Sequence, residues 1–338
     1  MRPAVHGALV ADIGGTNARL ALAVEGRREL SAVRHLRCAD FPDLVSLLEH
    51  YLQDATSDTR IHPGDAWLAL AGPVDSDPVQ LTNRPWRFSR EQLLRQLQLT
   101  RLELVNDFAA QARGVLELDA ARLTRVLGGT PRIHGPRLVI GPGTGLGMAL
   151  LVPTGNTWLT LPSEGGHVHF APTNADEDRL LAWFRQRHQR VSVERLLSGD
   201  GLLGLYQAHA EQADQRLECT TPAQVSAAGA RGNSLAVRSI RVFLKVLGDV
   251  AGDAALTAGA RGGVYLCGGI LPRLQIQLGD SGFAHAFRDK GRLGQYISDI
   301  PVWLAADDTL GLRGVAALWR QSRGRSGKLA NPASFGEA

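Results

Sequence analysis

Residues suited to binding a phosphate and a metal ion stand close together near the start of the chain, in the stretch LVADIGGTNARLAL. Apolar residues lead into Asp12, then Gly14 and Gly15 follow, and a second apolar run begins after Thr16 and Asn17. Glycine lets backbone N–H groups approach a phosphate closely, and Thr16 and Asn17 add side-chain donors. The carboxylate of Asp12 could hold Mg²⁺ directly or through water. This stretch therefore predicts a phosphate site with its metal, although an ordinary glycine hairpin has the same composition.

A second stretch of the same kind, RLVIGPGTGLGMALLV, begins at Arg137. Its turn contains Gly143, Thr144 and Gly145, and β-prone residues come next. A dinucleotide-binding loop is followed by a helix, so the glycine spacing is not that motif. Two β-prone runs joined by a glycine-rich turn predict a hairpin in both stretches. Their repetition indicates a duplicated fold with a nucleotide held between its halves.

An acidic residue, Asp107, stands where a buried strand, Leu102–Val105, runs into a helix. Asn106 and Asp107 are both residue types preferred at a helix N-cap, which is one interpretation of the pair. The other is a general base at the carboxyl edge of a sheet, where α/β folds bind their ligands. The residues alone leave both interpretations open.

Two further acidic residues, Glu164 and Glu194, lie in polar segments later in the chain. Glu164 precedes two glycines and His167 in LPSEGGHVHFAP, which is either a polar cluster open to a ligand or a surface loop. On a strand His167 and His169 would share a face. Two imidazoles without a cysteine nearby only weakly indicate a zinc site. Glu194, in SVERLLSGDG, is explained by the dipole of a helix that begins there, without any function.

The elements that must position these residues alternate between strands and helices. Helical spacing of apolar residues predicts helices at 40–54, after Ser89, after Asp107, at 174–188, twice between 221 and 260, and at 310–319. Buried-strand runs occur at 66–74, 102–105 and 301–304, and the run GGVYLCGGILPR is a strand that ends in Gly268 and Gly269. Such a glycine pair would let a base or ribose lie on the backbone. The alternation predicts a layered α/β architecture.

The composition is that of a globular protein that is large enough for two domains. The chain has 338 residues, of which 44% are hydrophobic and 21% charged, with a net charge of +4. No basic block interleaves with aromatic residues, so nucleic-acid binding is not expected. The three cysteines form no CxxC pair, and no uninterrupted apolar run would suit a membrane helix. We expect no signal peptide and a cytoplasmic location.

In order along the chain, the motifs DIGGTNARL, LTNRPW, LVNDFAAQA, IGPGTGLG, EGGHVHFAP, VERLLSGDG, LCGGI and DIPVWLAADDTLGLRG resemble those of the bacterial glucokinase family. This family belongs to the actin-like ATPase (sugar kinase/Hsp70/actin) superfamily, and the resemblance covers about residues 7 to 320. The cysteine-rich zinc motif of the repressor/kinase group is absent from the sequence. The chain departs from the family pattern at Ser163 and at Asp200, and neither change removes a ligand.

The resemblance implies a role for each candidate residue. It places the β- and γ-phosphates of ATP and Mg²⁺ near Asp12, Gly14, Gly15, Thr16 and Asn17, with Asp12 as the metal residue. It makes Gly143, Thr144 and Gly145 the second phosphate motif, and Gly268 and Gly269 the adenosine motif. It implies that glucose is bound by Asn106, Asp107, Glu164, His167 and Glu194, with Asn83 as a weaker candidate. Asp107 would be the catalytic base.

The activity implied is transfer of the γ-phosphoryl group of ATP to the 6-hydroxyl of D-glucose, which gives glucose 6-phosphate and ADP. Phosphoryl transfer depends mainly on positioning and charge neutralisation, and the polar ring of candidates would supply partners for the sugar hydroxyls. One alternative is a kinase for mannose, fructose or an N-acetylated hexosamine. Another is a non-catalytic actin-like ATP-binding sensor, which would not need the sugar residues.

The expected fold is a two-domain actin-like ATPase (RNase H-like) α/β fold with a deep interdomain cleft. A small domain would comprise residues 1–115 plus 306–326 and a large domain residues 116–305, with 327–338 as a flexible tail. The resemblance also suggests a homodimer. Neither nucleic acid nor membrane is an expected partner.

Overall fold

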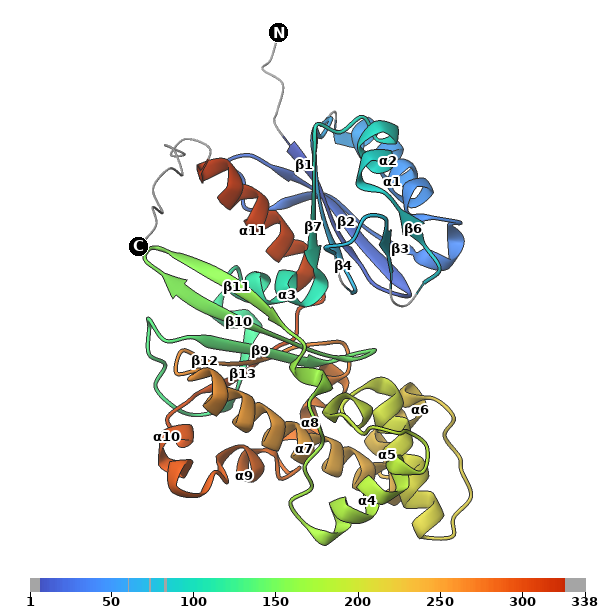
Figure 1. The fold of residues 1–338 in the computed structure, drawn as a ribbon, viewed down its shortest axis with the longest axis vertical. Helices are drawn as coiled ribbons and strands as arrows, with labels where there is room; N and C mark the ends of the chain where they lie inside the picture. The colour runs from blue at the N-terminus through green and yellow to red at the C-terminus, as the bar shows by residue number, and fades with distance from the viewer. Residues whose placement is uncertain (1–6, 60, 73, 82–83, 326–338) are drawn as a thin grey trace, which may run out of the picture. The chain divides into compact units, whose positions relative to one another are not determined.

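The computed structural model describes residues 7–59, 61–72, 74–81 and 84–325 (Figure 1). The chain divides into two compact units, residues 1–118 with 309–338 and residues 119–308. The sequence placed the corresponding boundaries near 115 and 305. Asn83 and the expected tail at 327–338 lie outside the described residues.

The first unit is built on a five-stranded sheet in the order β3-β2-β1-β4-β7. Its strands are β1 (Gly7–Ile13), β2 (Asn17–Val24), β3 (Leu30–Arg37), β4 (Asp65–Leu70) and β7 (Arg101–Asn106). The hairpin expected around Gly14 and Gly15 is confirmed, because β1 and β2 pair antiparallel from Ile13 and Ala18 outward. β1 and β4 are parallel, as are β4 and β7.

Helices cover both faces of this sheet because the buried side chains of β1 alternate between two cores. Leu9, Ala11 and Ile13 join the core that includes α1 (Leu44–Thr59) and α2 (Arg90–Gln96). Ala8 and Val10 join the core of the opposite face, which includes residues of α3 (Asp107–Val115) and α11 (Leu310–Arg325). A short two-stranded ladder, β5 (Val79–Gln80) with β6 (Arg87–Phe88), completes the unit.

The second unit repeats the arrangement of the first sheet and adds one strand, in the order β11-β10-β9-β12-β13-β8. Its strands are β8 (Leu123–Leu127), β9 (Arg137–Pro142), β10 (Leu146–Thr154), β11 (Thr157–Ser163), β12 (Gly263–Leu266) and β13 (Val302–Ala305). In each sheet an antiparallel meander of three strands is followed by two strands parallel to its first strand. The second expected hairpin is thus confirmed, with a turn at 143–145.

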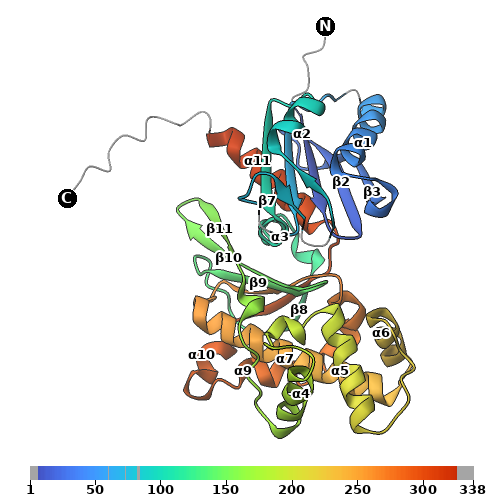
Figure 2. The ribbon, with the colours of Figure 1, turned by 45° about the vertical axis from the view of Figure 1, so that its right-hand side comes forward.

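The core of the second unit is largely helical. Its helices are α4 (Ala175–Arg185), α5 (Gly199–Gln212), α6 (Pro222–Ala230), α7 (Ser234–Ala258), α8 (Gln275–Leu278), α9 (Phe283–Arg288) and α10 (Gly294–Ser298). The long helix α7, orange in Figure 2, runs beneath the sheet and buries Phe243, Leu244 and Leu247. Within the described ranges, no helix is long and apolar enough to cross a lipid bilayer.

Candidate active site

Strand register brings the acidic candidates of the first unit to one edge of its sheet. Ile13 pairs with Leu70 of β4, and Leu70 pairs with Asn106 of β7, in parallel register. The carboxyl ends of β1 and β7 therefore lie two strands apart, about 10 Å at the usual strand spacing. Asp12 comes just before the end of β1, and Asp107 directly follows β7.

Asp12 is a buried carboxylate, 9% exposed, at the end of a strand. Burial is the main cause that raises its pKa to about 6; Arg19 lowers this pKa and Asp107 raises it. The guanidinium of Arg19, opposite Asp12 in the hairpin, has its Nη1 4.0 Å from Oδ2 of Asp12. A Cβ atom on Gly311, in the first turn of α11, would lie 2.4 Å from the same oxygen, so only glycine fits there. The site thus holds a carboxylate that its surroundings neutralise only in part.

The turn between β1 and β2 presents backbone donors next to Asp12. Gly14 N–H donates to the carbonyl of Asn17 at 3.0 Å and closes the turn. The N–H groups of Gly15 and Thr16 have no acceptor among the residues that the structure describes. The side chains of Thr16 and Asn17 are exposed. Successive donors of this kind form a concave site for an anion.

Asn106 and Asp107 occupy the start of α3, so the N-cap interpretation holds for Asn106. Its Oδ1 accepts hydrogen bonds from the N–H groups of Phe108 and Ala109, each at 3.0 Å. Asp107 is the first residue of the helix, and its Oδ1 accepts from Phe108 N–H at 2.8 Å. Capping fixes the position of the Asp107 carboxylate relative to the sheet edge. The role of Asn106 as an N-cap is therefore compatible with a role of Asp107 as a general base.

In the second unit the three sugar candidates lie together. Nδ1 of His167 is 3.8 Å from Oε1 of Glu194, and its Nε2 is 3.7 Å from Oε2 of Glu164. The side chains of Glu164 and His167 are 83% and 57% exposed, and that of Glu194 is 29% exposed. The imidazole therefore lies between two carboxylates on a surface that is accessible to a ligand.

Glu194 also joins this cluster to the second glycine turn. Its Oε2 accepts a hydrogen bond from the N–H of Leu146 at 2.8 Å. A Cβ atom on Gly145 would lie 2.4 Å from the same oxygen, so the carboxylate packs directly on the turn because residue 145 is glycine. The N–H of Gly143 donates to the carbonyl of Gly145 at 2.7 Å and keeps the turn tight.

His167 and His169 do not lie on a common strand, so the shared face considered for them does not arise. His167 ends a 3₁₀ turn, Gly165–His167, while His169 forms an isolated bridge to Ser192. His169 instead accepts a hydrogen bond from Nε of Arg190 at 3.2 Å. Among the described residues, no group of three or more His, Cys, Asp or Glu side chains could hold a metal ion.

The glycine pair after β12 lies beside the second turn. A Cβ on Gly268, whose φ is +91°, would lie 2.4 Å from the carbonyl of Pro142, the last residue of β9. Gly269 has open space around its Cα. The expected adenosine motif and the second phosphate motif are thus neighbours in the same sheet.

Sequence reasoning missed two arginines near the first turn. Arg19 lies opposite Asp12 because the turn of the β1–β2 hairpin spans residues 14–17, whereas a two-residue turn at Gly14 and Gly15 would have placed Asn17 there. Arg84 donates to the carbonyl of Gly15, which is far away in sequence, and no local pattern indicates that contact.

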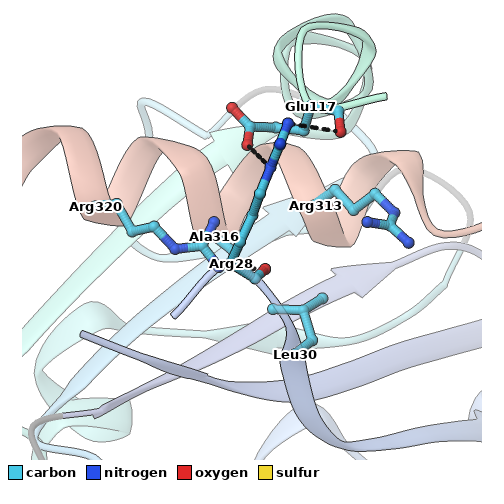
Figure 3. Close-up of a pocket in the computed structure, with 6 residues that line it drawn as sticks. All are labelled: Arg28, Leu30, Glu117, Arg313, Ala316 and Arg320. Carbon is cyan, nitrogen blue, oxygen red and sulfur yellow. Dashed lines mark hydrogen bonds and ion pairs between the residues drawn. The ribbon is translucent and has the colours of Figure 1, made fainter. Parts of the chain in front are cut away.

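A small cavity in the first unit is separate from these residues (Figure 3). Its lining residues are Arg28, Leu30, Glu117, Arg313, Ala316 and Arg320. Arg28 donates to the carbonyl of Glu117 at 3.2 Å, and Nη2 of Arg320 donates to the carbonyl of Arg28 at 2.9 Å. Cations at the carboxyl end of α3 are favoured by the helix dipole, so we assign this cluster a structural role.

Comparison with known proteins identifies the family. The family model described as Glucokinase matches residues 9–322. A glucokinase of Chromohalobacter salexigens is 49% identical over 307 residues, which cover 91% of this chain and 95% of that protein. The solved structure of a glucokinase from an Antarctic psychrotroph is 36% identical, with a TM-score of 0.82, over 93% of this chain and 99% of that one.

A more distant structure shows how widely the fold is shared. A ROK family glucokinase from Streptomyces griseus, solved in complex with glucose and AMPPNP, is 19% identical, with a TM-score of 0.65. The similarity covers 93% of this chain and 99% of that one. Together with two α/β units whose sheets share one topology, these matches show that the chain has the actin-like ATPase fold and belongs to the glucokinase family.

Proposed function

We propose that the chain transfers the γ-phosphoryl group of ATP to the 6-hydroxyl of D-glucose, with Asp107 as the general base. The observation that carries this proposal is the cluster of Glu164, His167 and Glu194, in which Glu194 packs on a glycine-rich turn through Leu146 N–H. A sensor that bound only ATP would not need this accessible ring of donors and acceptors. A relative of the same fold was solved with both glucose and an ATP analogue bound.

Asp107 is suited to accept the proton of the 6-hydroxyl. It stands at the amino end of α3, where the helix dipole and the N–H of Phe108 stabilise its carboxylate. A positioned general base contributes roughly 10²–10⁴-fold to rate. Asn106, whose Oδ1 is used in capping, keeps its amide N–H groups to donate to a sugar hydroxyl.

The sugar residues of the second unit supply complementary groups. Glu164 and Glu194 accept hydrogen bonds from hydroxyls, and His167 can donate to one or accept from one according to its tautomer. Each hydroxyl that is left without a partner on binding would cost affinity, so such a ring selects a polyol. Asn83 is a further sugar candidate that rests on the family motif alone.

The nucleotide would use both glycine turns. The free N–H groups of Gly15 and Thr16, with the side chains of Thr16 and Asn17, suit the phosphates. Gly143, Thr144 and Gly145 would form the second phosphate motif. The backbone at Gly268 and Gly269 would receive the adenosine.

We propose that Mg²⁺ accompanies the nucleotide at Asp12. The residue fits this ion because Mg²⁺ is usually held by one or two carboxylates together with substrate phosphates. Burial raises the pKa of Asp12 because it disfavours the charged carboxylate, and a bound cation would favour that charged form. When bound, Mg²⁺ would neutralise charge on the phosphates. We also propose a cytoplasmic homodimer that has neither nucleic acid nor membrane as a partner.

The decisive experiment is ATP-dependent phosphorylation of glucose, mannose, fructose and N-acetylglucosamine, followed by release of ADP. We expect strong preference for glucose. Preference for another hexose would keep the reaction type and change the acceptor. Lack of turnover with every sugar, together with measurable ATP binding, would overturn the proposal in favour of an ATP-binding sensor.

A further inference from the structure

The phosphate turn after β1 is held by contacts to its carbonyl groups. Nε of Arg84 donates to the carbonyl of Gly15 at 2.7 Å. The backbone N–H of Cys38 donates to the carbonyl of Thr16 at 2.9 Å, and its Sγ lies 3.5 Å from the carbonyl oxygen of Gly14. Three consecutive carbonyl groups are therefore engaged from the side of Cys38 and Arg84.

Engagement of the carbonyls decides where the amide groups point. A trans peptide is planar, with its C=O and N–H on opposite sides. When Arg84 binds the carbonyl of Gly15, the N–H of Thr16 must point away from the guanidinium. Two successive glycines would otherwise let these peptides rotate freely.

Arg84 is itself firmly anchored. Its guanidinium lies over the ring of Trp86 at 5.1 Å, and Trp86 is only 4% exposed. Nη1 of Arg84 donates to the carbonyl of Cys38 at 3.2 Å, so one guanidinium joins the turn to the start of the η1 turn, Cys38–Asp40. The N–H of Leu81 donates to the carbonyl of Trp86 at 3.1 Å and closes the loop that carries Arg84.

We infer that Arg84 is a positioning residue, which fixes the Gly15–Thr16 peptide so that its N–H can bind a phosphate of the nucleotide. The inference rests on the proposed function for the identity of the ligand. Arg84 reaches the carbonyls of two separate segments with a planar fork. A lysine carries a single ammonium on a flexible stem and cannot reproduce that geometry fully.

The test compares three variants of the whole chain. Arg84→Ala removes both contacts, and Arg84→Lys keeps the charge and one donor. Arg320→Ala is the matched control, because it also removes an arginine that donates to a backbone carbonyl in the same unit, away from the turn (Figure 3). ADP affinity by calorimetry, KM for ATP and for glucose, and thermal stability are measured for each variant.

We expect Arg84→Ala to weaken ADP binding and to raise KM for ATP about tenfold, as loss of one positioned N–H donor to a charged phosphate predicts. The KM for glucose should change by less than about twofold, because the proposed glucose residues do not include those of the turn. Arg84→Lys should recover part of the ATP affinity, and Arg320→Ala should bind both substrates as the wild type does.

Unchanged ADP affinity and KM for ATP in Arg84→Ala would overturn the inference. The inference would also be overturned if Arg84→Ala lost ATP and glucose affinity equally, with a lower melting temperature, and if Arg84→Lys recovered neither. Arg84 would then have a purely structural role. Calorimetry separates these results from failure of the proposed function. A wild type that binds ADP but phosphorylates no sugar would contradict the function and leave the Arg84 effect measurable.

Discussion

Two carboxylates, those of Asp12 and Asp107, lie at the carboxyl ends of strands in the first sheet. Asp12 lies near the end of β1, and Asp107 directly follows β7, two strands away. Burial is the main cause of the raised pKa of Asp12; Arg19 lowers this pKa and Asp107 raises it. Such a pair suits a site that binds a cation and removes a proton. The two carboxylates differ in surroundings, because Asp12 is buried beside Arg19 while Asp107 begins a helix.

Asp107→Asn should lower kcat by roughly 10²–10⁴-fold, because the amide cannot accept the proton of the hydroxyl. Glucose affinity should stay close to the wild-type value, since the amide keeps the size and most hydrogen-bonding capacity of the side chain. Steady-state kinetics and glucose calorimetry measure the two quantities. Near-normal turnover with normal glucose binding would exclude Asp107 as the base.

Asp12→Asn should stabilise the fold at neutral pH while impairing activity. Because the pKa of Asp12 rises from 3.8 to about 6 on folding, the folded state binds its proton more tightly than the unfolded state does. Its contribution to stability therefore falls as pH rises from about 4 to about 6, and ionisation costs about 3 kcal/mol above that range.

The advantage of the Asp12→Asn variant in urea unfolding should thus appear above about pH 6 and shrink below about pH 4. At saturating glucose and about pH 7.5, roughly 1.5 units above this pKa, the variant should need a higher Mg²⁺ concentration than the wild type for half-maximal phosphorylation activity. Equal stability of variant and wild type across this pH range would show that burial does not strain the carboxylate.

At the scale of elements, the hairpin turns hold functional groups by close approach. Glu194 comes from the η4 turn, Val193–Arg195, yet it hydrogen-bonds to the first residue of β10. The sequence predicted both hairpins, because a glycine-rich turn between two β-prone runs is a local signal. It could not predict that Glu194 packs on the second turn, because that contact joins residues far apart in the chain.

Gly145→Ala should displace the Glu194 carboxylate, because the added Cβ would lie 2.4 Å from Oε2. We expect KM for glucose to rise about tenfold or more, in keeping with the loss of one hydrogen-bonded charge. Gly128→Ala is the control, since a Cβ at Gly128 meets no atom within 4 Å. Comparable glucose kinetics in both variants would contradict the coupling of this turn to the sugar site.

At the scale of the whole chain, the first unit is made from both ends of the sequence. Helix α11 follows the entire second unit along the chain and packs on the first sheet through Leu312, Val315 and Trp319. Nε1 of Trp319 donates to Oδ2 of Asp65 at 3.0 Å, at the start of β4. Folding of the first unit therefore requires the chain to return after the second unit.

Trp319→Ala should destabilise the protein by about 3–5 kcal/mol, as expected for removal of a large buried ring. Trp319 is 1% exposed and the variant would also leave the Asp65 carboxylate without this donor. Urea unfolding followed by circular dichroism measures the loss. Leu293→Ala, at a side chain 49% exposed, is the control, and an equally small effect of both substitutions would contradict this account.

The sequence by itself determined the fold family, the two hairpins, most helices and the candidate residues, because these depend on short-range patterns and ordered motifs. It missed the strands β3, β8 and β11, which lie at sheet edges or in the outer part of a meander and depend on pairing with a neighbour for their formation. It left open whether His167 lies on a strand, because period-two spacing cannot distinguish a strand from a short turn.

Only the tertiary structure decided how the candidate groups are positioned. The register of β1, β4 and β7 brings Asp12 and Asn106 to one edge, and close approach at Gly145 sets Glu194 against the second turn. The contact of Arg84 with Gly15 spans 69 residues. A local sequence pattern carries no information about such contacts, because chain topology, strand register and the packing of distant segments determine them together.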